Sequence, residues 1–157
     1  MNESGVPVDW QIEVDNRQTV VPVDAGSIVR AVEQVLRQES CGRAQIHVVL
    51  VDDREIRQLN RRFLDHDYAT DVISFTYAAV PELEGELIVG AERAQRVADT
   101  LPHSWQCELL WYVVHGTLHL LGYEDGDASQ RERMRAREGV AMRALGLVWP
   151  MEEEAAS

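Results

Sequence analysis

Hydrophobic positions in the first fifty residues follow two different periods. Residues 10–15 place apolar side chains at every second position, which predicts a strand. Asp24 then stands before a stretch whose apolar residues have helical spacing: Ile28, Val32, Val35 and Leu36. Residues 45–51 are β-branched and apolar on both faces, as expected of a central strand that is covered on two sides. The order predicted here is strand, helix, strand.

The next segment predicts a helix followed by a β-hairpin. Asp53 is predicted to cap a helix whose apolar face carries Ile56, Leu59 and Phe63. Residues 71–77 alternate as a strand and are followed by a loop through Pro81 and Gly85. Residues 86–89 predict a short strand that pairs with the previous one, and residues 91–98 predict a helix.

The most apolar segment of the chain begins at Ser104. Nearly every face of residues 104–121 is apolar, which predicts a helix buried at the centre of the domain and ended by Gly122. A final helix over residues 129–145 follows, with Asp127 and Gln130 at the spacing of a capping box. Its inward positions are Met134, Ala141 and Leu145. Residues 150–157 are expected to be an acidic, solvated tail.

Together these elements predict a single α+β domain over residues 1–157. A mixed sheet of about four strands is expected to pack on the central buried helix. A chain of 157 residues is long enough for one core and short for two ordinary domains. We therefore look for a single functional site.

Composition and charge limit the partners that this chain can have. No apolar run approaches the length of about 18 residues that a membrane span requires, and no basic and apolar leader is recognisable. Cys41 and Cys107 are far apart and predict no disulfide scaffold, so a reducing cytoplasm is the expected location. A net charge of −12 argues against general nucleic-acid binding. We expect no membrane or DNA partner, and any RNA contact must be local.

Two histidines on the buried helix are the main candidates for chemistry. His115 and His119 are four residues apart, so their imidazoles project from one helix face and can reach the same metal ion. The spacing fits two hydrogen-bonded core histidines equally well. After the helix, however, Glu124, Asp125 and Asp127 turn the chain back and offer a third, oxygen ligand.

The histidine segment resembles the YbeY family of ribosomal-RNA endoribonucleases. Residues 115–123, His-Gly-Thr-Leu-His-Leu-Leu-Gly-Tyr, are similar to the start of the family signature His-Gly-x-Leu-His-Leu-x-Gly-Tyr-Asp-His. Three further blocks agree in order and spacing: Leu-Asn at 59–60, Thr-Asp-Val-Ile-Ser-Phe at 70–75 and Gly-Glu-Leu at 85–87. The resemblance covers roughly residues 45–147 and implies the same α+β architecture.

The resemblance also implies a function and its partners. It implies metal-dependent, single-strand-specific cleavage of RNA during 3′ maturation of small-subunit ribosomal RNA and ribosome quality control. The implied cofactor is one divalent metal ion, expected to be zinc. The implied partners are ribosomal RNA and the ribosome or its assembly factors.

One departure from the family pattern concerns the metal ligands. The family's third metal-binding histidine falls on Asp125, and Glu124 takes the place of the family's aspartate. The implied metal site is therefore His115, His119 and Asp125, a set that zinc accepts and that harder ions such as Mn²⁺ enter more easily. In the alternative, Asp125 only caps or turns the chain and the metal is lost.

A second departure concerns the contact with phosphate. Leu64 stands where family members often carry an arginine thought to serve the reaction. Arg61 and Arg62 are a fraction of a turn away and could substitute, although arginines on an exposed helix face are usually solvated. We expect RNA to contact a restricted basic surface that includes Arg57 and Arg61, with Arg54 and the arginines of the last helix around them.

Other polar residues have weaker claims. Glu108 lies two turns before His115 on the same helix face and could orient that imidazole, or could simply be an acidic residue at a helix start. Trp111 is expected in the core. Gly116 stands where zinc proteases with a similar histidine pair carry their glutamate base. Three histidines are not expected in the site: His47, His66 and His103.

Two functions of other classes stay open at this stage. One is a non-catalytic, metal-binding ribosome-assembly factor, which the two departures would permit. The other is a hydrolase of peptides that pair with the strand at residues 70–75, an idea that the missing glutamate makes the weakest of the three.

Overall fold

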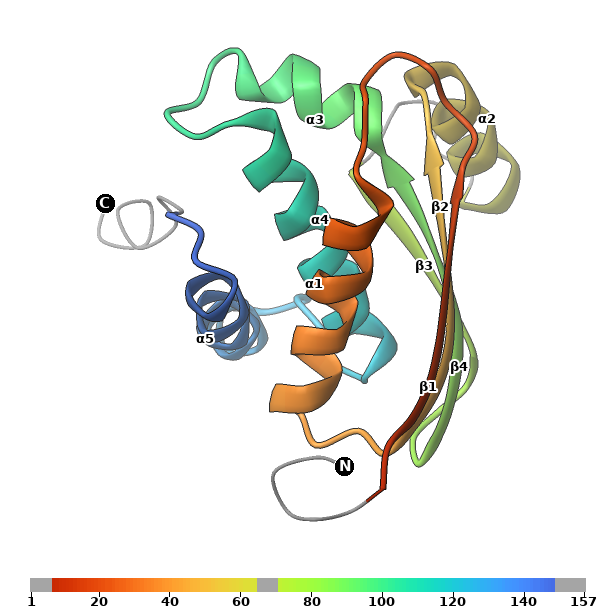
Figure 1. Ribbon diagram of the computed structural model, residues 1–157, viewed down its shortest axis with the longest axis vertical. Helices are drawn as coiled ribbons and strands as arrows, with labels where there is room; N and C mark the ends of the chain where they lie inside the picture. The colour runs from red at the N-terminus through yellow and green to blue at the C-terminus, as the bar shows by residue number, and fades with distance from the viewer. Residues whose placement is uncertain (1–6, 65–70, 149–157) are drawn as a thin grey trace.

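Four strands form one mixed sheet in the computed structural model, which describes residues 7–64 and 71–148 (Figure 1). The strands are β1 (Asp9–Asn16), β2 (Arg43–Val51), β3 (Val72–Ala78) and β4 (Glu82–Gly90). Their order is β1-β2-β4-β3; β1, β2 and β4 are parallel, and β3 is antiparallel to β4. The predicted α+β class with a mixed sheet of four strands is confirmed.

The helices cover the two faces of the sheet unequally. Within the described residues they are α1 (Ala25–Gln38), α2 (Asp53–Leu64), α3 (Ala91–Ala98), α4 (Trp105–Leu120) and α5 (Ala128–Ala144). Figure 1 shows α1 and α4 on one face, with α5 packed outside them, and α2 on the opposite face at one end of the sheet. Only the large layer of helices is extensive enough to enclose a core along the whole sheet.

Strand β2 shows the consequence of this unequal cover. Its last four residues, Val48 to Val51, are all buried, because Val48 and Leu50 face the main core while Val49 and Val51 face Ile56 of α2. Its first half instead alternates between buried and exposed positions. The expectation that residues 45–51 are covered on both faces was therefore right only for the part of the strand that α2 covers, Val48 to Val51.

Glycine allows α4 to lie directly on the sheet. A Cβ atom at Gly116 would meet Leu87 Cδ2 at 2.9 Å and Val72 Cγ2 at 3.0 Å, and one at Gly85 would meet Leu120 Cδ2 at 2.7 Å. The prediction of a loop through Gly85 was wrong, because this glycine lies inside β4, where the end of α4 approaches. The strand is consequently longer than residues 86–89.

Helix α2 differs from its prediction at both ends. Its cap is Asp52, whose carboxylate accepts a hydrogen bond from Glu55 N at 2.9 Å, whereas Asp53 is already helical. Phe63 was expected on the buried face, but 53% of it is exposed. The buried residues are Ile56 and Asn60, whereas Phe63 lies at the edge of this layer, where its ring meets that of Phe75 of β3 edge to face, with centroids 5.7 Å apart.

Helix α5 begins as predicted and buries two residues that were not expected. The Asp127–Gln130 capping box is present, and Met134 and Ala141 are buried. Leu145 follows the helix and is half-buried, whereas Glu138 and Met142 lie fully in the interior. The acidic tail and His66 fall outside the described residues. No helix in residues 7–64 and 71–148 is long and apolar enough to cross a membrane.

Candidate metal centre

The end of α4 presents two histidines side by side. Ser104 caps the start of this helix by accepting a hydrogen bond from Cys107 N, and Gly122, with φ +104°, ends it. His115 and His119 therefore occupy successive turns at its C-terminal end. Their rings are 4.7 Å apart between centroids and lie edge to face, at 82°. The local sequence alone fixes this arrangement, because a regular helix places residues four apart on one face.

The turn after α4 brings Asp125 to the histidine pair. The two Nε2 atoms are 3.2 Å apart, and Asp125 Oδ2 lies 3.6 Å from His115 Nε2 and 3.4 Å from His119 Nε2. In a tetrahedral zinc site with bonds of about 2.0–2.1 Å, ligand atoms lie about 3.3–3.4 Å from one another. The three atoms thus have the separations that a single tetrahedral ion requires.

Hydrogen bonds behind the two rings determine which nitrogens face this triangle. His119 Nδ1 donates to Tyr123 O at 2.9 Å, since a carbonyl only accepts. His115 Nδ1 lies 3.2 Å from Glu138 Oε2. If His115 also donates there, two imidazole lone pairs and a carboxylate converge. Three acceptors repel one another unless a cation lies between them, so this donor set fits a divalent metal.

The triangle is accessible from one side. The side chains of His115 and His119 are 23% and 27% exposed, and that of Asp125 is 47% exposed. The ring nitrogens that face inward are held by Glu138 and by the backbone, whereas the Nε2 atoms face toward Asp125. Three protein ligands with one side open to solvent is the arrangement of catalytic zinc sites, in which a fourth position stays available.

Sequence reasoning missed Glu138 and offered Glu108 as one candidate to orient His115, beside the alternative that Glu108 is simply an acidic residue at a helix start; the structure has Glu108 in the first turn of α4. Glu108 does not approach His115; it lies against His103 Nε2 at 2.6 Å near the other end of α4. Trp111, expected in the core, is only half-buried and donates from Nε1 to Glu138 Oε2 at 2.7 Å. A signal for Glu138 was available: it lies four residues after Met134 and three before Ala141, so that a charged residue interrupts the inward stripe of the last helix.

The arginines of α2 are not brought to this site. Arg54, Arg57 and Arg61 are exposed on a helix that packs against the opposite face of the sheet from α4 (Figure 1). Arg131 of α5 lies much nearer, because its Nη1 donates to Asp125 O at 3.3 Å. The part of the expected basic surface next to the candidate ligands thus belongs to the last helix.

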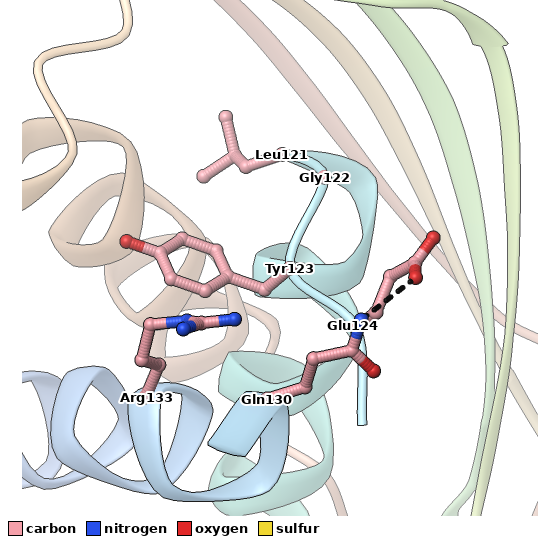
Figure 2. Close-up of a pocket in the computed structure, with 6 residues that line it drawn as sticks. All are labelled: Leu121, Gly122, Tyr123, Glu124, Gln130 and Arg133. Carbon is pink, nitrogen blue, oxygen red and sulfur yellow. Dashed lines mark hydrogen bonds between the residues drawn. The ribbon is translucent and has the colours of Figure 1, made fainter. Parts of the chain in front are cut away.

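A pocket of about 320 Å³ is lined by the residues that directly precede Asp125 in the chain, 121–124, and by Gln130 and Arg133. Figure 2 shows that the turn after α4 forms one side and α5 the other, with the Tyr123 ring near the Arg133 guanidinium. Gln130 closes the opposite end by donating to Glu124 Oε2 at 3.4 Å. Tyr123 belongs to both regions, since its side chain lines the pocket while its carbonyl holds His119.

The cysteines take no part in the candidate centre. Cys41 and Cys107 are both buried and unpaired with each other. Burial, together with the negative charge of Glu108, raises the pKa of the Cys107 thiol to about 11. A protonated thiol is a poor metal ligand, so the histidines and Asp125 are the relevant donors.

The fold and the converging side chains define a class: an α+β protein with a partly open candidate metal centre built from two histidines and one carboxylate. The family model for Endoribonuclease YbeY matches residues 13–146, which is most of the chain. The chain belongs to the YbeY family. The resemblance inferred from the histidine segment is thereby confirmed.

Individual relatives agree with this assignment. The Endoribonuclease YbeY of Rhodopirellula baltica is 44% identical over 119 residues, a match that covers 74% of this chain and 61% of that protein. That of Salinibacter ruber is 34% identical, covering 78% of this chain and 84% of the relative. The solution structure of TM1509 from Thermotoga maritima shares the fold, with a TM-score of 0.62 and 22% identity over 94% of this chain and 93% of that one.

Proposed function

We propose that this protein is a metal-dependent endoribonuclease that cuts single-stranded RNA, and that it acts in 3′ maturation of small-subunit ribosomal RNA and in ribosome quality control. The observation that carries the proposal is the convergence of His115 Nε2, His119 Nε2 and Asp125 Oδ2 at one accessible point. The names of the relatives supply the class of reaction. The ribosome and its assembly factors, in the cytoplasm, are the proposed partners.

Each residue of the proposed site has a separate task. His115, His119 and Asp125 would hold the ion, expected to be zinc. A divalent ion bound there supplies a Lewis acid that acidifies water and polarises a phosphate oxygen. Tyr123 O orients the His119 ring. The partial exposure of all three ligand side chains leaves the site open to an RNA strand.

The proposed path of the RNA follows α5 before α2. Arg131 contacts the backbone of Asp125, and Arg133 lines the adjacent pocket. On the open face of the sheet, a second hollow of about 240 Å³ is lined by Glu13, Glu84 and Glu86 and repels phosphate. Arg57 and Arg61 would add contacts only where a longer RNA reaches the other layer of the molecule.

RNA cleavage by purified protein tests the function. Protein stripped of metal and reloaded with zinc should cut an unstructured RNA with the sequence of the small-subunit 3′ end, and should leave a duplex of the same sequence intact. A chelator should abolish cutting, and zinc should restore it. Cleavage that persists in the His119→Ala variant would show that a contaminating nuclease, and not this centre, is responsible.

The RNA path has its own test. Arg131→Ala and Arg133→Ala together should weaken RNA binding and reduce the salt slope by about two phosphate contacts. Arg57→Ala with Arg61→Ala forms the matched pair on α2 and should have the smaller effect on short RNA. A larger effect of the α2 pair would move the RNA to that surface.

A non-catalytic, metal-binding assembly factor is the second candidate. Leu64 at the position of the family's arginine favours it, since a site without a phosphate clamp can bind metal without cutting. Complementation of a deletion strain separates the two functions. Growth restored by a variant that binds zinc but does not cut RNA in vitro would favour the assembly factor.

A further inference from the structure

A buried carboxylate stands behind the candidate metal centre. The Glu138 side chain is 3% exposed, and among the described residues its hydrogen-bond partners are an indole and an imidazole, those of Trp111 and His115. A buried carboxylate is costly unless a positive charge or strong donors compensate it, and removing one charge of a buried pair is destabilising. Among the described residues, the indole N–H and the imidazole are the groups that compensate it, and a cation bound beyond the imidazole would add to their effect.

We propose that Glu138 is the positioning residue of the metal centre, whose carboxylate, fixed by Trp111, keeps a proton on His115 Nδ1 and leaves Nε2 to bind the divalent ion. The inference rests on the metal site of the proposed function and not on RNA cleavage.

The geometry gives each partner one possible task. Trp111 Nε1 can only donate, so its 2.7 Å contact fixes Glu138 Oε2 in place. The same oxygen lies 3.2 Å from His115 Nδ1 and accepts its proton. The Trp111 and His115 rings are also in contact, with centroids 5.6 Å apart. The imidazole is thus held by a hydrogen bond and by packing, and its free lone pair faces His119 and Asp125.

Charge supports the same assignment. When a metal is bound, the ligand carboxylate of Asp125 is ionised and the two imidazoles are neutral. An ionised Glu138 adds a second negative charge behind them. A divalent cation brings the sum of these groups to zero. A carboxylate behind a histidine ligand fixes the ring and makes the ligand nitrogen more basic. Glu138 should therefore strengthen metal binding although it does not touch the ion.

Zinc affinity in the Glu138→Gln variant tests this role. The amide keeps the shape of the side chain and removes its charge, so we expect zinc affinity, measured by competition with a chromophoric chelator, to fall about 10- to 100-fold. The metal-free variant should unfold at the same temperature as the parent or higher, because a buried charge is gone. Trp111→Phe, which removes the hydrogen bond that fixes Oε2 and shortens the ring but leaves the carboxylate in place, should weaken zinc binding less.

The matched control is Glu108→Gln. This residue is also a buried glutamate beside a histidine of the α4 region, but its partner is His103. Its zinc affinity should equal that of the parent. Zinc affinity of Glu138→Gln within twofold of the parent, in a folded protein, would overturn the proposal.

The tautomer of His115 gives a readout that needs no variant. In zinc-loaded parent protein, ¹⁵N-resolved NMR of the ring should show the proton on Nδ1 and the metal on Nε2; ligation through Nδ1 would overturn the proposal even if Glu138→Gln fails to fold. The two ideas fail separately. Parent protein that binds zinc with the expected tautomer but never cuts RNA contradicts the proposed endoribonuclease and leaves the role of Glu138 intact.

Discussion

Near each end of α4 a histidine is paired with a buried glutamate, and the two pairs differ in the ring nitrogen that they use. At the first end, His103 contacts Glu108 through Nε2, and both side chains are less than 10% exposed. At the other end, His115 faces Glu138 through Nδ1. The Nε2 atom of His103 is therefore occupied by Glu108, whereas the Nε2 atom of His115 is left for a ligand.

The surroundings of the unused nitrogens complete the contrast. His103 Nδ1 is buried and has no hydrogen-bond partner among the described residues. His115 Nε2 instead lies 3.2 Å from His119 Nε2 and 3.6 Å from an Asp125 oxygen, in a region open to solvent. The same two residue types thus stabilise the fold at one end and present a ligand atom at the other.

Loss of a ligand should have the largest effect and should occur only at the second end. We expect His119→Ala to reduce zinc affinity more than about 100-fold, because even outer partners of a ligand account for about 10- to 100-fold. Chelator competition measures it. His103→Ala is the matched substitution and should leave zinc affinity as in the parent. Equal losses in both variants would mean that the contrast between the ends is false.

Stability should show the opposite pattern. His103→Ala leaves the Glu108 carboxylate buried beside Tyr112 without its partner, and breaking such a pair costs about 3–5 kcal/mol. Chemical denaturation of metal-free protein measures the free energy of unfolding. His119→Ala should cost clearly less, since that ring is partly exposed. A His103→Ala protein as stable as the parent would show that the buried pair contributes nothing.

Local patterns were enough to predict most of the fold and half of the candidate site. The hydrophobic period is set by the residues of each element itself. Ser104 and the Asp127–Gln130 capping box lie at the starts of the helices that they define, so the helix that carries both histidines could be recognised. Asp125 was placed through the resemblance to the family, and the structure brings it to the histidines. These features need no knowledge of tertiary contacts.

The rest depended on contacts between distant segments. His115 and Glu138 are 23 residues apart, and the inward stripe of α5 shows that Glu138 is buried without showing what it meets. Gly85 looked like part of a loop because only the approach of Leu120 explains a glycine inside β4. The place of α2 on the far face likewise separates Arg57 and Arg61 from the histidines, which no periodicity reveals.

Packing of α4 on the sheet gives an intermediate effect. Gly116→Ala should destabilise the protein by about 1–3 kcal/mol, because the added methyl group meets side chains of β3 and β4 that are themselves packed. Gly139→Ala in α5 is the control: its methyl group meets only the end of the flexible Arg143 side chain, and helix propensity should stabilise it by about 0.5–1 kcal/mol. The two thermal unfolding shifts should have opposite signs.

The smallest effect concerns the turn that holds His119. Tyr123 uses its carbonyl for His119 Nδ1 and its hydroxyl for Glu39 Oε1, at 2.6 Å. Tyr123→Phe removes only the hydroxyl, so stability should fall by about 1 kcal/mol at pH 7, while zinc affinity stays unchanged. A large loss of zinc affinity would show that the anchor to α1, and not the carbonyl alone, orients the ring.

The pH dependence of that stability difference follows from Glu39. Burial alone would raise the pKa of Glu39, but hydrogen bonds from Tyr123, Arg137 and Gln38 and the charge of Arg137 bring it below its usual value. A lowered pKa stabilises the fold above the unfolded-state value and loses this contribution as pH falls through the folded-state value. Because Tyr123→Phe removes one of the lowering hydrogen bonds, its deficit against the parent should be full at pH 7 and should shrink as the carboxylate becomes protonated in acid. Urea denaturation of both proteins at pH 7 and at successively lower pH measures this trend, and a deficit that grows in acid would contradict the role assigned to Glu39.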